Sequence, residues 1–188
     1  MPSHPPIPPL LSPYINPPST SLTLLTSTLS ATTNWLILRF VLAALKHKGL
    51  SSSNDGASSR ESARETRVVL VSWLRDANFW KDGGRRLGIN FQRVCIVDAL
   101  SNGLGFGPDS VDKTEETIFK AINDTTAAGK GEGEILLVLD GLDFLLAASG
   151  CPAVQILEMI GELREVCALP HMHPNSDLLT STLQTARA

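Results

Sequence analysis

Apolar stretches alternate with polar loops along most of the chain, and their lengths predict alternating strands and helices. Short runs of Val, Ile and Leu are typical of buried strands, whereas longer stretches with apolar residues at helical spacing are typical of helices packed on a sheet. The predicted strands are 22–28, 67–72, 93–98 and 134–140. The predicted helices are 34–48, 77–87 (broken by Gly83-Gly84), 113–128 (capped by Ser110 or Asp112), a short helix 144–148, and 153–168. This order predicts an α/β fold with a parallel sheet and right-handed crossovers.

Three segments differ from this pattern and set the predicted domain limits. Residues 1–19 form a proline-rich lead with eight of the twelve prolines, which we expect to be extended or disordered rather than regular helix or central strand. Residues 49–66 are rich in serine and are expected to form a flexible insertion, because they carry too little apolar surface to offset the entropy of ordering. Residues 170–188 form an irregular polar tail. The domain itself is expected to span residues 20–169.

The charges are divided unevenly between the two halves of the chain. Residues 1–93 contain 11 Lys and Arg against 5 Asp and Glu, whereas residues 94–188 contain 5 against 14. The overall net charge of −3 therefore combines a basic half with an acidic half. This balance excludes a histone-like polycation but is compatible with a local basic surface.

The cysteines and the longest apolar run exclude further classes of protein. Three cysteines at wide spacing form neither a disulfide framework nor a paired zinc or redox motif, so we expect reduced thiols in an intracellular protein. Cys167, His171 and His173 have irregular spacing, and we expect no metal site there. The N-terminus lacks the pattern of a signal peptide. The apolar run 35–45 is too short to cross a membrane, so we expect no membrane association.

The first predicted strand, loop and helix occupy the place where a nucleotide-binding α/β protein carries its phosphate loop. Such a loop needs glycines, which let backbone N–H groups approach the phosphates, and a lysine that neutralises them. Residues 22–45 contain neither glycine nor lysine. The glycines at 103, 105 and 107 and the pair Gly129-Lys130 also lack the full spacing of a dinucleotide or phosphate motif. We therefore expect no nucleotide cofactor.

The predicted strand 134–140 nevertheless ends like the second half of a nucleotide site. Asp140 closes the strand and Asp143 follows three residues later. In phosphate-loop enzymes a carboxylate at this position holds the metal ion, directly or through water. One reading is therefore an atypical NTPase that uses Asp140 for the metal. The other reading is structural, with Asp140 ending the strand and Asp143 capping the short helix 144–148.

A basic stretch interleaved with aromatic residues follows the second predicted strand. Arginine and lysine beside aromatic rings can hold phosphates and stack bases, which makes this stretch a candidate contact region for RNA or for a neighbouring subunit. An amphipathic helix with aromatics in the core and charges in water is the alternative. The candidate residues are Trp73, Arg75, Trp80, Lys81, Arg85, Arg86 and Arg93.

The segments SLTLLTSTLSATTNWLI, RVVLVSWLRDANFWKDGGRRLGINF and GEILLVLDGLDFLLAASG together resemble a fungal member of the Elongator complex protein 6 family. The resemblance covers residues 20–48 and 67–169. It implies a RecA-like fold of the P-loop NTPase type with a degenerate phosphate loop, and no catalysis. It also implies a hetero-hexameric ring with Elongator proteins 4 and 5, which binds tRNA and supports the catalytic Elongator core in modifying the wobble uridine.

The resemblance carries two further expectations. Family members act in the cytoplasm and nucleus, and this chain is expected to do the same. Relatives also continue with further strands after the position of Ala168, so the tail 170–188 indicates a truncated chain or an artefact of the gene model. Missing strands leave a sheet edge open unless a partner covers it.

Overall fold

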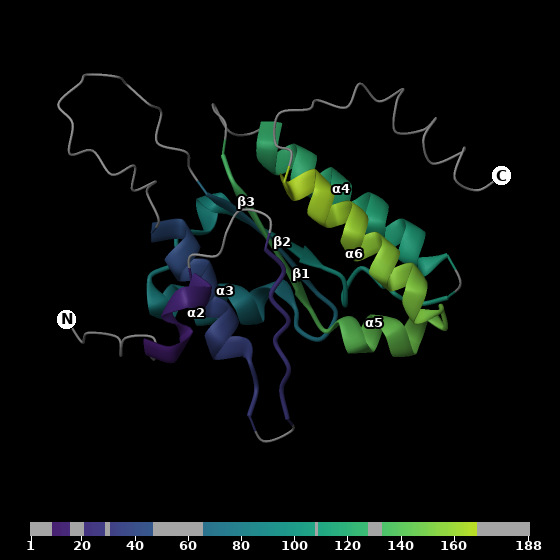
Figure 1. Cartoon of the computed structure of the whole chain (residues 1–188), viewed down its shortest axis with the longest axis horizontal. Helices are drawn as coiled ribbons and strands as arrows, with labels where there is room; N and C mark the ends of the chain where they lie inside the picture. Colours follow the sequence, from purple (N-terminus) through teal and green to yellow (C-terminus); the bar gives the residue numbers. More distant parts are fainter. Residues whose placement is uncertain are drawn as a thin grey trace.

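The structure is a computed structural model, and its elements follow the predicted alternation over most of the domain (Figure 1). It describes residues 9–15, 21–28, 31–46, 66–107, 109–127 and 133–168. The predicted tail lies outside these residues, and so does the predicted insertion apart from Thr66.

Three parallel strands form the sheet: β1 (Arg67–Ser72), β2 (Val94–Asp98) and β3 (Ile135–Asp140). The order is β2-β1-β3, so the earliest of the three in the sequence is the central one. The chain passes from β1 to β2 on one side, and then crosses β1 to reach β3 on the other. The parallel α/β architecture predicted from the sequence is thereby confirmed, and it is compatible with a RecA-like core.

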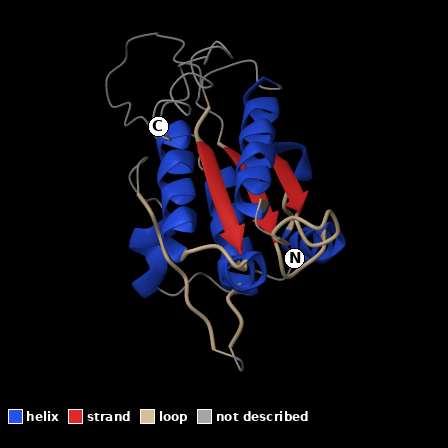
Figure 2. Cartoon of the chain, turned by 90° about the vertical axis from the view of Figure 1, so that its right-hand side faces the viewer, coloured by secondary structure: helices blue, strands red, loops and turns tan. Residues whose placement is uncertain are grey.

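Helices cover both faces of this sheet (Figures 1 and 2). One core lies between the sheet and helices α2 (Asn34–Lys46) and α3 (Ala77–Leu87), and the other between the sheet and helices α4 (Ser110–Ala127) and α6 (Ala153–Ala168). Alternation along β1 supplies both cores. Val68 and Leu70 enter the first, and Val69, Val71 and the following Trp73 enter the second. Helix α5 (Leu142–Ser149) lies near the carboxyl ends of the strands.

The predicted strand 22–28 is wrong. Residues 21–27 have no regular structure, and Thr28 makes only an isolated bridge to Ala31. Leu25 packs on the α2 core, while Leu22 and Leu24 stay exposed. Threonine and leucine favour a strand, but a strand also needs a neighbour that pairs with its backbone.

Part of the proline-rich lead was also predicted wrongly. A 3₁₀ turn at Pro9–Leu11 leads into the single helical turn α1 (Ser12–Ile15). Proline is tolerated there because the first N–H groups of a helix have no partner within the helix. Pro13 lies within that first turn, so it does not interrupt the helix.

Helix α3 runs through Gly83-Gly84 without a break, contrary to the prediction. The Asp76 side chain accepts a hydrogen bond from Phe79 N (2.9 Å) at its start, and Gly88 ends it at a φ of 75°, which favours glycine. Gly84 contacts the Phe91 ring, and a side chain there would collide with that ring. The small residue is therefore required by packing, and packing stabilises the helix despite the low propensity of glycine.

The remaining boundaries shift by a few residues. Helix α4 begins at Ser110, so neither Ser110 nor Asp112 lies ahead of it as a cap. The predicted strand 93–98 begins one residue later, because residues 91–93 form the 3₁₀ helix η2 (Phe91–Arg93). The helices predicted at 77–87 and 153–168 are confirmed at both ends.

Candidate functional site

The carboxyl ends of the three strands bring three polar residues into one row. The register pairs Ser72, at the end of β1, with Asp98 on β2 and with Asp140 on β3. The connections from β1 and β3 leave in opposite directions here, which is where open α/β sheets ordinarily bind ligands. This row is therefore the candidate functional site.

Asp140 is held inside the row by Ser72. The Ser72 hydroxyl donates to Asp140 Oδ2 at 2.8 Å and accepts a hydrogen bond from Arg75 N at 3.0 Å. Asp140 is 8% exposed. Burial raises its pKa, and the nearby charge of Asp143 adds to this, although the Ser72 hydrogen bond and Arg75 oppose the rise. A carboxylate in this setting faces a cost for carrying its charge.

Asp98 lies on the other side of Ser72, and its carboxylate accepts hydrogen bonds from the segments that follow β1 and β2. Its Oδ1 accepts from Ser101 N (2.8 Å), and its Oδ2 accepts from Ser101 Oγ (2.9 Å) and Ala77 N (3.1 Å). Partial burial raises the pKa, but the hydrogen bonds from Ser101 and Ala77 outweigh it, so that the pKa of Asp98 is lowered. Asp98 thus fixes the start of α3 and the turn that follows β2.

Asp143 lies beside the row but does not cap its helix as predicted. Helix α5 begins at Leu142, and its N-cap position is taken by Gly141, which makes no side-chain capping bond. Asp143 is exposed in the first turn, where its negative charge interacts favourably with the positive end of the helix dipole. The φ of Gly141 is 86°, and the Leu74 side chain packs directly against it.

Arg75 is the predicted contact residue that lies at the row. Its guanidinium sits over the Phe79 ring, 5.3 Å from the ring centre, and Nη1 donates to the Leu74 carbonyl at 3.1 Å. The side chain is half-buried. Arg75 therefore contributes a positive charge next to Asp140, and its guanidinium also makes a cation–π contact with an aromatic ring.

Three of the other predicted cations lie exposed on α3. Lys81, Arg85 and Arg86 all face solvent, and Arg85 forms a 3.2 Å ion pair with Asp82. Such exposed pairs contribute little to stability. Lys81 and Arg85 lie one turn apart on α3, and Arg86 follows Arg85. We call these three exposed cations the basic ridge. Among the described residues, Lys81 and Arg86 are its cations without such a pair.

Trp73 and Trp80 are not surface contacts. Both have 0% exposure, and they lie in different cores, Trp73 on the α4 side and Trp80 on the α2 side. Their indole N–H groups find no hydrogen-bond partner among the described residues. The two tryptophans of this segment therefore stabilise the two helix–sheet cores. Phe79 differs from them, because it is 41% exposed.

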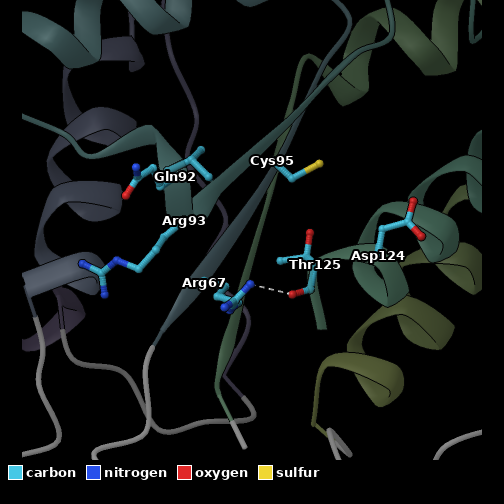
Figure 3. Close-up of a pocket in the computed structure, with 7 residues that line it drawn as sticks. Arg67, Gln92, Arg93, Cys95, Asp124 and Thr125 are labelled. Atoms are coloured by element: carbon cyan, nitrogen blue, oxygen red, sulfur yellow. Dashed lines mark hydrogen bonds between the residues drawn. The ribbon is translucent and has the colours of Figure 1, made fainter. Parts of the chain in front are cut away.

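Arg93 lies at the opposite end of the sheet. Its Nη2 donates to the Leu45 carbonyl near the end of α2, and Arg67 Nη1 donates to the Thr125 carbonyl near the end of α4 at 2.8 Å (Figure 3). Both arginines therefore hold helix C-termini, which favour positive charge. They also line a shallow cavity of about 200 Å³, together with Gln92, Val94, Cys95, Asp124 and Thr125. The sequence analysis missed this cavity, because Arg67 and Asp124 are 57 positions apart.

The comparisons with known proteins leave the family open. No family model matches the chain, and no curated protein or solved structure matches it. Among the described residues, no group of three or more His, Cys, Asp or Glu side chains is arranged to hold a metal ion. No helix in the same part of the chain is long and apolar enough to cross a membrane.

Proposed function

We propose that the chain is a non-catalytic, RecA-like subunit of the Elongator accessory ring. In this role it would assemble with Elongator proteins 4 and 5 and support the catalytic Elongator core in wobble-uridine modification, in the cytoplasm and nucleus. The chain's own contribution would be contacts with neighbouring subunits and with tRNA.

The observation that carries the proposal is the burial of Asp140 against Ser72. In an NTPase the strand-end carboxylate must reach the metal ion, directly or through water. Asp140 instead lies buried against the Ser72 hydroxyl, with its pKa raised by burial. The region that would hold phosphates, residues 22–45, has neither glycine nor lysine. Both halves of a nucleotide site therefore favour a structural role.

The basic ridge on α3 supports the tRNA part of the proposal. Lys81 and Arg86 are exposed cations on a regular helix, and they lie one turn or more apart along it. Lysine and arginine on a helix surface can neutralise phosphates of a nucleic acid backbone without reading its sequence.

Co-expression of the full chain with Elongator proteins 4 and 5 tests the assembly. We expect one complex that contains all three chains, and the rate of ATP turnover by this complex should be unchanged when Asp140 is replaced by Asn. A chain that elutes alone in the presence of both partners would contradict the proposal.

The tRNA contact is tested on that complex with the double variant Lys81→Ala and Arg86→Ala. Removing these cations should weaken binding of all tRNAs alike and lower the slope of log affinity against log salt by about 1 for each phosphate that is no longer neutralised. Lys113→Ala is the matched control, because Lys113 is an exposed lysine on α4, on the opposite face of the sheet. Equal affinity of the double variant and the control would remove the ridge from the proposal.

An atypical NTPase remains the second candidate, because Asp140 ends β3 at the point where the strand connections diverge. Calorimetric titration of the full chain with MgATP separates the two candidates. Micromolar binding that Asp140→Ala abolishes and Asp143→Asn retains would favour the enzyme. A titration without heat of binding would favour the structural role.

A further inference from the structure

The segments that follow the strands at the carboxyl end of the sheet expose several large apolar side chains. Each of them comes from the segment that follows one of the three strands, and each leaves 40 to 57% of its surface exposed. We call these residues the carboxyl-end surface: Leu74, Phe79, Leu100 and Phe106. Single exposed apolar residues are ordinary, whereas several gathered at one end of a molecule mark an interaction site.

Direct packing connects one side of this surface through α5. Leu74 packs so closely on Gly141 that a Cβ there would lie 2.8 Å from Leu74 Cγ. Gly141 leads directly into α5, where Phe144 meets Phe106 edge to face with ring centres 5.7 Å apart. The loop after β1, helix α5 and the loop before α4 therefore meet around one patch.

Arg75 connects the other side of the surface. Its guanidinium donates to the Leu74 carbonyl and lies over the Phe79 ring. The Leu100 backbone N–H donates to the Ser72 carbonyl at 3.3 Å, which places the loop after β2 beside the end of β1. Apolar side chains from all three connections thus surround the row of Ser72, Asp98 and Asp140.

The charge around these side chains is negative. Asp143 is exposed in the first turn of α5, and its charge acts on Asp140 in the row. Asp109 is exposed directly before α4, and Asp76 is half-buried and precedes α3 as its N-cap. Arg75 is the cation in contact with the patch, and its charge is shared with the nearby Asp140. An anionic partner such as a nucleic acid would be repelled here, whereas a cationic one would be attracted.

We propose that the carboxyl-end surface docks a segment of another protein that combines apolar side chains with lysine or arginine. The leucine and phenylalanine side chains would bury the apolar residues of that segment, and the carboxylates of Asp109 and Asp143 would face its cations. Aromatic side chains, phenylalanine among them, are enriched in the buried cores of protein interfaces. The inference goes beyond the proposed function, since it depends on the chemistry of the partner and not on membership of the Elongator ring.

The test uses the full chain and two labelled amphipathic helical peptides of equal length, one of leucine and lysine and one of leucine and glutamate. Fluorescence anisotropy should show binding of the leucine–lysine peptide and much weaker binding of the leucine–glutamate peptide. The double variant Phe106→Ser and Leu100→Ser should weaken binding of the first peptide about tenfold, which corresponds to a combined loss of about 1.4 kcal/mol from two truncated interface side chains. Leu157→Ser is the matched control, since Leu157 is a 65% exposed leucine on α6.

A second variant keeps the test independent of packing changes in the double variant. Asp143→Asn removes one exposed carboxylate, and it should weaken the leucine–lysine peptide more at low salt than at high salt. The proposal is overturned if both peptides bind equally, if Leu157→Ser weakens binding as much as the double variant, or if the wild type binds neither peptide. A concentration-dependent dimer in sedimentation that the double variant abolishes would overturn it too, because a second copy would then cover the surface.

Discussion

Asp98 and Asp140 hold equivalent places at the ends of the two outer strands, yet their surroundings shift their pKa values in opposite directions. Each lies next to Ser72 in the same row. Asp98 receives hydrogen bonds from Ala77 and Ser101 and has a lowered pKa, whereas Asp140 is buried with a single side-chain donor and has a raised one. Equivalent positions in the fold therefore do not give two carboxylates the same pKa. Deeper burial raises the pKa of Asp140, whereas the hydrogen bonds from Ser101 and Ala77 lower the pKa of Asp98.

Among the substitutions near this pair of carboxylates, the largest loss of stability should come from replacing the buried indole of Trp73. Trp73 has 0% exposure and donates its backbone N–H to the Asp140 carbonyl at 3.0 Å. Trp73→Ala should lower the free energy of unfolding by about 3–5 kcal/mol, because it leaves a large cavity in the core. Urea unfolding followed by circular dichroism measures the change.

Leu157→Ala provides the control for that measurement, since Leu157 is exposed and should change stability by less than about 0.5 kcal/mol. A loss below about 1 kcal/mol for Trp73→Ala would mean that the loops are held by other contacts.

Asp98→Ala should have the next largest effect. It removes the acceptor for Ala77 N, Ser101 N and Ser101 Oγ, and thereby frees the start of α3. We expect a loss of about 1.5 kcal/mol, at the lower end for hydrogen bonds to a charged group, because water can reach the freed donors. Hydrogen exchange should increase at Ala77 and Ser101 while β1 stays protected. Unchanged exchange at both amides would contradict the role given to Asp98.

The smallest expected effect is a change in how stability depends on pH, and its sign should differ between Asp140 and Asp98. The folded-state pKa of Asp140 is raised above its ordinary value of 3.8, so its contribution to stability is present below that value and is lost as the pH rises through the raised pKa. Asp140→Asn should therefore gain stability relative to the wild type as the pH increases from 3.8 to neutral. Thermal unfolding across that range measures the difference.

Asp98→Asn should show the opposite trend. The pKa of Asp98 is lowered, so its contribution is present above 3.8 and is lost as the pH falls through the lowered pKa. The variant should therefore fall behind the wild type as the pH rises. Parallel curves for the two Asn variants would show that the two sites do not differ as described.

The sequence predicted elements well where local signals and burial agreed. The centre of the run RVVLVS, Val68 to Val71, is continuously apolar because β1 is covered on both faces, and the limits of this strand agree with the prediction. The segment 22–28 combines leucine with threonine, which also favours a strand, but strand formation needs a neighbouring strand that pairs with its backbone, which no local pattern specifies. The helix break predicted at Gly83-Gly84 was wrong for a related reason. The need for a small residue beside Phe91 appears only in the packed structure.

The candidate site divides in the same way. Asp140 was found from its place after an apolar strand, whereas Ser72 and Asp98 were missed because their contact with it depends on the strand register. Trp73 and Trp80 were predicted as contacts from their basic neighbours, but each lies on the side of its element that faces a core. Polar partners across a sheet, and the direction of an aromatic side chain at a strand end, are tertiary information.

The position of β1 at the centre of the sheet also sets the order in which the domain can be completed during synthesis. The ribosome makes β1 first, and β2 can pair with it soon afterwards. Its second edge stays open until β3 emerges, since Ser72 and the Asp140 that it binds are 68 residues apart. During that interval a short apolar strand with an unpaired edge is exposed to other nascent chains. A pause in translation between residues 98 and 135 would prolong this exposure, so synonymous codons in that stretch should influence the soluble yield.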